Sequence, residues 1–172
     1  MTESQRPRRS TSRSTYDRAL DLLEVRARSV TELRRALLRK GEPEPDVEAA
    51  IERLRASGLL DDASFARQFA RSKALGPGHS RRRIQQELGK RGVARDVSDA
   101  AIEDVFEDEA VDEDASIERV ARKKLRMLST ADEPTRRRRL YGFLARRGYN
   151  NDDIIRVLDS LLASTDGRSD VP

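Results

Sequence analysis

Acid–base and metal chemistry at neutral pH depends most often on histidine, and this chain has one, His79, in the loop sequence GPGHS. No second histidine is present to share a metal, and the absence of cysteine excludes thiol catalysis and cysteine-based zinc or iron–sulfur centres. The glycines beside His79 resemble a phosphate loop, but no strand pattern precedes them and no Gly-Lys-Ser/Thr follows. We therefore expect no catalytic residue, metal or cofactor.

Carboxylates gather between Asp99 and Glu118, a stretch with ten acidic residues and no basic one. Their spacing fits neither an EF-hand calcium loop nor a pair of catalytic carboxylates. We interpret this stretch as a solvated helix end followed by an acidic linker over 107–116.

The overall charge is positive. The 172 residues include 35 lysines and arginines against 31 acids, which gives a net charge of +4 and a pI near 9.7. Such a balance attracts polyanions, so a nucleic acid is the first class of partner to consider. Charged residues make up 38% of the chain and aromatic residues only 4%, a mixture that favours amphipathic helices over a β-sandwich or barrel.

One apolar pattern occurs three times: an aliphatic residue, a leucine four residues later and a glycine eight residues later. The copies are Leu33, Leu37 and Gly41; Ile84, Leu88 and Gly92; and Leu140, Leu144 and Gly148. Apolar residues return ten and thirteen residues after each glycine. The sixth residue after the glycine is also apolar in the first and third copies, but in the second copy it is Ser98. A glycine after a basic last turn ends a helix in the left-handed conformation, so each copy predicts two helices joined at the glycine.

A third amphipathic segment precedes each pair, over 16–28, 64–73 and 117–128. Helix-start residues agree with this assignment, because Ser29 with Glu32 forms a capping-box pattern and Ser80 precedes the middle helix of the second copy. We predict an all-α protein of three tandem three-helix (helix-turn-helix-like) repeats that stack into an elongated body. The predicted boundaries are 16–60, 61–106 and 117–162, with disordered tails over 1–15 and 163–172.

Helix geometry predicts which side chains face outward. At 100° per residue, the positions ten, nine, six and two before each glycine lie opposite the apolar stripe. They are Arg82, Arg83, Gln86 and Lys90 in the second copy, Arg138, Arg139, Gly142 and Arg146 in the third, and Thr31, Glu32, Arg35 and Arg39 in the first. Two neighbouring repeats thus present arginine-rich faces suited to a phosphate backbone or an acidic protein groove.

A helix-turn-helix transcription factor is a rival interpretation. It would place the third helix of a repeat in the DNA major groove. Those helices read DVEAAIERL, DVSDAAIEDVFEDE and NDDIIRVLDSLL, and their acidic residues would be repelled by phosphate. Sequence-specific readout of that kind is therefore disfavoured.

The stretch GLLDDASFARQFARSKALGPGHSRRRIQQELGKRGV, over 58–93, resembles the central signature of the RecX family, which regulates the bacterial RecA recombinase. The flanking helical units extend this similarity over about 16–162. The resemblance implies a curved rod that is not an enzyme and that binds the RecA–single-stranded-DNA filament, restraining its recombinase and ATPase activities and the SOS response. It also adds the basic residues of the signature, Arg67, Arg71 and Lys73, to the candidate contacts.

A sequence-independent DNA-binding protein with no recombinase partner is the alternative. Both functions need exposed arginine, and only the first needs a specific protein surface.

No stretch is apolar enough to cross a membrane, and the lack of cysteine is compatible with a reducing cytoplasm, where we expect the protein. Because packing within the repeats accounts for the apolar residues, we expect a monomer.

Overall fold

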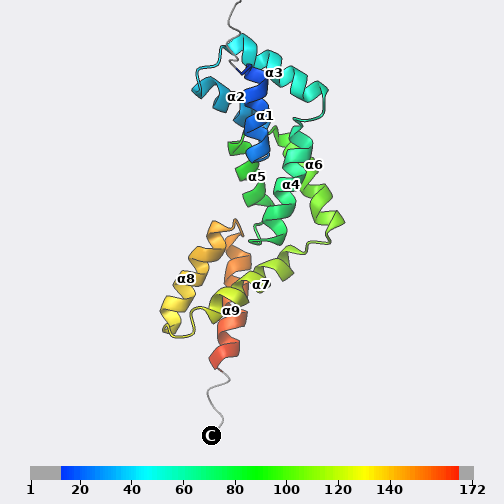
Figure 1. Ribbon diagram of the computed structural model, residues 1–172. Coiled ribbons are helices and arrows are strands. Elements are labelled where there is room, and N and C mark those ends of the chain that lie inside the picture. The colour runs from blue at the N-terminus through cyan, green and yellow to red at the C-terminus, as the bar shows by residue number, and fades with distance from the viewer. Residues whose placement is uncertain (1–12, 167–172) are drawn as a thin grey trace, which may run out of the picture. The chain divides into compact units, whose positions relative to one another are not determined.

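A computed structural model describes residues 13–166, whose regular secondary structure is entirely helical (Figure 1). The chain divides into two compact units, one ending at Asp61 and one beginning at Asp62. The first contains α1 (Thr15–Val25), α2 (Val30–Arg39) and α3 (Glu44–Ala56). The second contains α4 (Asp62–Leu75), α5 (Arg81–Lys90), α6 (Arg95–Asp108), α7 (Glu113–Arg126), α8 (Glu133–Arg146) and α9 (Asn151–Asp166). The predicted all-α fold of tandem three-helix repeats is confirmed.

The repeated apolar positions form the cores. The six aliphatic residues before the three glycines, Leu33, Leu37, Ile84, Leu88, Leu140 and Leu144, are all fully buried. Each set packs with the first and third helices of its own repeat in a separate cluster. Ser98 occupies the buried position of the pattern although it is polar. Its side chain is buried, and its hydroxyl donates to the Ala94 carbonyl at 2.9 Å.

The middle helices end at the predicted glycines, and α2 and α5 begin at the predicted serine caps. Gly41, Gly92 and Gly148 have φ of +83°, +77° and +88°, in the left-handed region that glycine adopts without strain. Ser29 forms its capping box with Glu32, and Ser80 caps α5. At α9 the cap is Asn150, whose Oδ1 accepts the Asp153 amide at 2.9 Å.

The basic tail predicted over 1–15 is too long at its C-terminal end. Ser14 caps α1, and Thr15 is a buried helical residue whose hydroxyl donates to Glu42 at 2.6 Å. This hydrogen bond lowers the pKa of Glu42. At the other terminus α9 continues to Asp166, beyond the start of the tail predicted at 163. Residues 1–12 and 167–172 lie outside the described residues.

Most of the predicted acidic linker is helical. Helix α6 continues to Asp108 and α7 begins at Glu113, four residues before the predicted start, so four residues separate the two helices. The acids explain this early start, because Asp112 Oδ1 accepts the amide of Asp114 at 2.8 Å and Glu113 and Asp114 lie in the first turn, where the helix dipole favours negative charge.

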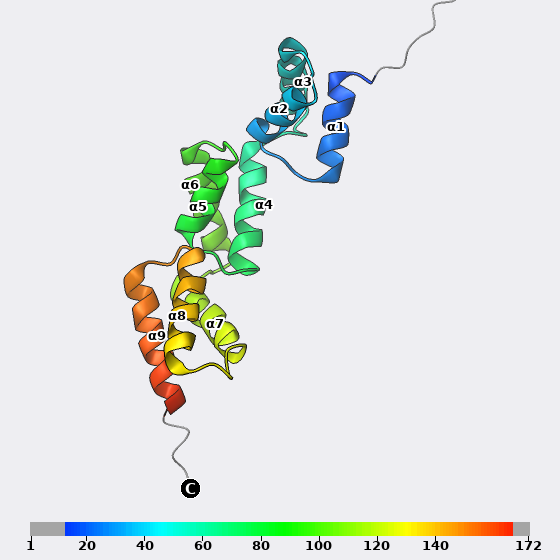
Figure 2. The ribbon, with the colours of Figure 1, turned by 90° about the vertical axis from the view of Figure 1, so that its left-hand side faces the viewer.

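A joint holds the second and third repeats together within the second unit. The loop before α5 meets the loop after α8, so that the C-terminal end of α8 lies beside the N-terminal end of α5 (Figures 1 and 2). Ser80 donates its amide to the Arg147 carbonyl at 3.0 Å, and Arg147 Nε donates to the Pro77 carbonyl at 2.9 Å. Tyr149 Oη donates to the Gly78 carbonyl at 3.0 Å.

Two glycines allow this close approach. A Cβ at Gly148 would lie 2.6 Å from both the Arg83 Cβ and the Ser80 Oγ, and one at Gly78 would lie 2.6 Å from Val120. The loop that resembled a phosphate loop in the sequence is therefore a packing surface for the third repeat.

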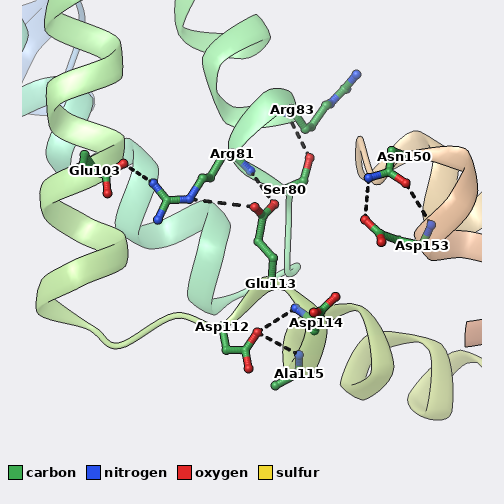
Figure 3. A network of polar contacts seen from close by, with 10 residues as sticks. All are labelled: Ser80, Arg81, Arg83, Glu103, Asp112, Glu113, Asp114, Ala115, Asn150 and Asp153. Atoms are coloured by element: carbon green, nitrogen blue, oxygen red, sulfur yellow. Dashed lines mark hydrogen bonds and ion pairs between the residues drawn. The ribbon is translucent and has the colours of Figure 1, made fainter.

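A carboxylate reinforces the joint from α7. Glu113 accepts the backbone amide of Arg81 at 3.0 Å, and the Arg81 side chain also forms an ion pair with Glu103 on α6 (Figure 3). One residue at the start of α5 is thus tied to helices of both repeats. These contacts fix the relative position of α5 and α8.

We expect Gly148→Ala to destabilise the second unit by about 2–4 kcal/mol. The left-handed conformation costs an alanine about 1–2 kcal/mol, and the crowding against Ser80 and Arg83 adds an overpacking cost of similar size. The control is Gly41→Ala, because Gly41 has nearly the same φ but nothing within 4 Å of its added Cβ. Urea unfolding of the full chain gives the loss of unfolding free energy for each variant. Equal losses in the two variants would show that the joint is not tightly packed.

His79 links this loop to pH. Its side chain is mostly buried, with Nδ1 3.7 Å from a Glu87 carboxylate oxygen. Burial lowers the pKa of His79 below 6.5, and the cations of Lys73, Arg147 and Arg83 act in the same direction while Glu87 opposes them. The folded protein therefore prefers the neutral imidazole.

The stability that His79 contributes should be present above pH 6.5 and fall as the pH drops below it, because the unfolded chain then takes up the proton more readily. We expect His79→Gln to flatten the dependence of the unfolding free energy on pH between about 7.5 and 5.5. Comparison of the two proteins at pH 8 corrects for the substitution itself. Parallel curves across this window would contradict the assignment.

Candidate nucleic-acid interface

The outward face of α5 is set by its buried side. Ile84 and Leu88 face the core of the second repeat, and Ser80 Oγ accepts the Arg83 amide at 3.3 Å to start the helix. Arg82, Gln86 and Lys90 are consequently exposed. Within the described part of the chain, neither Arg82 nor Lys90 has a carboxylate within ion-pair distance.

The outward face of α8 is built in the same way. Asp132 caps the helix by accepting the Thr135 amide at 3.2 Å, and Leu140 and Leu144 are fully buried. The basic residues predicted to face outward, Arg138, Arg139 and Arg146, are all exposed. None of the three forms an ion pair with another residue of the described chain.

The remaining candidates are partly neutralised. Arg83 pairs with Glu87 at 2.8 Å on its own helix. On α4, Arg67 pairs with Asp104 at 2.7 Å and Arg71 pairs with Glu109 at 2.8 Å, so both lie against the acidic helix α6. These three arginines are therefore partly neutralised, unlike the exposed cations Arg82, Lys90, Arg138, Arg139 and Arg146 of α5 and α8.

Aromatic rings hold several other cations. Lys73 Nζ lies 5.3 Å from the centroid of the Phe69 ring, and the Arg91 guanidinium covers the same ring at 4.7 Å. Arg147 lies 3.6 Å from the Phe143 centroid, and burial lowers its pKa. Arg91 and Arg147 are the C-cap residues of α5 and α8, and both are partly buried, with their guanidinium groups packed on these rings.

Burial also affects the joint beside these faces. It raises the pKa of Tyr149 to about 12, with Glu113 acting in the same direction. The phenol is protonated at physiological pH and donates to the Gly78 carbonyl. Sequence reasoning missed this joint, because its partners are about seventy residues apart and only the glycine-rich loop before a serine cap marked the place.

The described residues offer no other chemical centre. No group of three metal-binding side chains occurs among residues 13–166, and no helix in that range is long and apolar enough to cross a membrane. Among the sequence-predicted site residues, the exposed cations without an ion-pair partner in residues 13–166 lie on α5 and α8, whose adjoining ends are linked by the contacts of Ser80, Arg147 and Tyr149.

The sequence matches three family models in order along the chain. They describe the first three-helix domain of RecX over 16–54, the second over 61–102 and the third over 112–158. Together they cover most of the residues that the structure describes.

Full-length relatives agree with this assignment. The chain is 39% identical over 163 residues to the regulatory protein RecX of Mycolicibacterium vanbaalenii, an alignment that covers 90% of this chain and 87% of the relative. It is 33% identical over 155 residues to the regulatory protein RecX of Prosthecochloris aestuarii, covering 90% and 98% of the two chains.

Solved structures show the same fold. The crystal structure of RecX from Lactobacillus salivarius superposes with a TM-score of 0.66 over 86% of this chain and 94% of the other, at 19% identity. Another RecX crystal structure gives a TM-score of 0.69 at 23% identity over 84% of this chain and 71% of the other. With three domain matches in order and relatives aligned over nearly their full lengths, this chain belongs to the RecX family of regulatory proteins.

Proposed function

We propose that this protein binds the RecA–single-stranded-DNA filament and restrains its recombinase and ATPase activities and the SOS response, without catalysing a reaction itself. Membership of a family of regulatory proteins supports a regulatory role. The observation that carries the proposal is the pair of exposed basic faces on α5 and α8, which consist of cations without acidic partners in the described chain.

The joint makes these faces suited to a regular polymer. A filament repeats its charged groups at a fixed spacing, and a binder gains affinity when its own contacts are held at a matching spacing before binding. The contacts of Ser80, Arg147 and Tyr149 hold α5 and α8 in such a fixed arrangement. A filament that carries both acidic protein groups and phosphates would supply partners for the exposed cations of both helices.

A DNA-binding protein that needs no recombinase is the second candidate function. The same cations favour it, because a phosphate backbone alone could satisfy them. Pull-down of recombinase filament with and without nuclease treatment, with naked single-stranded DNA as the control, separates the two. The alternative would be favoured if recombinase is retained only when the DNA is intact and if the filament is bound no more tightly than naked DNA.

Removing two exposed cations at a time tests the faces. The variants are Arg82→Ala with Lys90→Ala on α5, and Arg139→Ala with Arg146→Ala on α8. Lys123→Ala with Arg126→Ala is the matched control, since these residues are exposed on α7 and the change in net charge is the same.

We expect each face variant to weaken inhibition of the filament ATPase about ten-fold at moderate salt, with the larger effect on α5, because several groove contacts are lost together. The control should change inhibition less than about two-fold. On naked DNA each lost phosphate contact should reduce the salt slope by about 0.7. Inhibition equal to that of the parent in both face variants would show that these cations are only solvated.

A further inference from the structure

An apolar groove runs between α8 and α9, which lie side by side in both views (Figures 1 and 2). It encloses about 400 Å³ and is lined by Pro134, Arg137, Arg138, Tyr141, Ile155 and Leu158. Tyr141 and Ile155 are each 40% exposed there, and Tyr141 is the only exposed side chain among the seven aromatic residues, all of which the structure describes. Tyr141 Oη donates to Asn151 Oδ1 at 2.8 Å, which fixes the ring at the groove edge.

The repeats provide an internal comparison. Tyr141 and Ile155 lie seven residues before and seven after Gly148, and the corresponding pairs are Arg34 with Glu48 in the first repeat and Gln85 with Asp99 in the second. In the first repeat this pair closes the position with two parallel hydrogen bonds of 2.6 and 2.8 Å.

The second repeat keeps the groove but makes it polar. There the equivalent groove encloses about 330 Å³ and is lined by Arg81, Arg82, Gln85, Arg95, Asp99, Ile102 and Glu103. Both repeats form an ion pair at equivalent positions. The arginine lies eleven residues before the glycine and the acid eleven residues after it, as Arg81 with Glu103 and as Arg137 with Asp159. Only the third repeat exposes two apolar side chains at a position that the same fold fills elsewhere with polar ones.

We propose that the groove between α8 and α9 docks an apolar side chain from an acidic protein segment. The apolar lining of the groove matches an apolar side chain of the partner. The charged residues at the groove rim favour partner residues of opposite charge beside that side chain. Arg137 is paired with Asp159 at 2.7 Å, whereas Arg138 is exposed and has no ion-pair partner within the described chain. A carboxylate beside the anchor can therefore pair with Arg138.

A nucleic-acid base fits the groove less well. Bases stack on flat aromatic or guanidinium faces. Of these the groove offers the single ring of Tyr141 and two guanidinium groups, of which Arg137 is held by Asp159. The rest of the apolar lining is aliphatic, from Pro134, Ile155 and Leu158. Such a lining suits a branched or aromatic side chain of a protein. The inference rests on the proposed function in so far as the recombinase would supply this segment.

Tyr141→Gln with Ile155→Gln replaces the two exposed apolar side chains of the groove without changing the charge. Leu75→Gln with Met127→Gln is the control, because these apolar side chains are equally or more exposed, at 44% and 68%, and lie outside the groove. Thermal unfolding establishes that all variants are folded. Binding is then measured to the recombinase filament and to naked single-stranded DNA.

We expect the groove variant to bind the filament about ten-fold more weakly, the control to differ less than about two-fold, and naked-DNA binding to be unchanged in both. Unchanged filament binding by the groove variant would overturn the inference. A parallel loss on naked DNA would assign the groove to a base instead. A parent that sediments as a dimer and a groove variant that does not would assign it to a second copy of this chain.

A peptide titration tests the groove even if the parent fails to bind the filament, a result that would refute the proposed function alone. The probes are two synthetic peptides with the same leucine spacing, one carrying aspartate and glutamate and the other lysine at the intervening positions. We expect the acidic peptide to shift the nuclear magnetic resonance signals of Tyr141 and Ile155 in the full chain, and the lysine peptide to leave them unchanged. Equal responses to the two peptides, or none, would overturn the assignment to an acidic segment.

Discussion

The architecture depends on one backbone requirement, a left-handed residue immediately after the C-cap of each middle helix. Glycine meets it at Gly41, Gly92 and Gly148 without steric cost and turns the chain so that the third helix packs back on the second. At Gly148 the missing side chain has a second consequence, because the backbone can approach Ser80 and Arg83 closely enough for the hydrogen bonds of the joint. The same turn therefore closes one repeat and attaches it to the preceding one.

Acidic residues of the third helices determine where positive charge remains exposed. Asp104 on α6 and Glu109 at its C-cap pair with arginines of α4, and Glu103 pairs with Arg81. Exposed ion pairs of this kind contribute little to stability. Their main effect is electrostatic, since they cancel the charge of α4 and leave Arg82 and Lys90 on α5 as uncompensated cations. A net charge of only +4 is thereby compatible with strongly basic local surfaces.

The repeats, their buried positions and the outward faces could be predicted from the sequence because they depend on spacing within one helix or across one turn. Ser98 shows the limit of reading by residue type, since a buried hydroxyl that bonds to the carbonyl four residues earlier fills an apolar position. Thr15 shows a second limit, because its partner Glu42 is 27 residues away. The joint depends on pairings about seventy residues apart, which local periodicity does not encode.

Repetition separates what the fold requires from what a surface adds. Every copy buries the residues four and eight positions before its glycine, so these positions serve the core. The residues seven positions before and after the glycine are not constrained in this way, and the three copies use them for an ion pair, a polar groove and an apolar groove. The third choice leaves Tyr141 and Ile155 each 40% exposed in one groove, although the repeat fold accepts polar residues at these positions in the other two copies. Docking of the proposed partner segment would bury this apolar surface and give the choice a function.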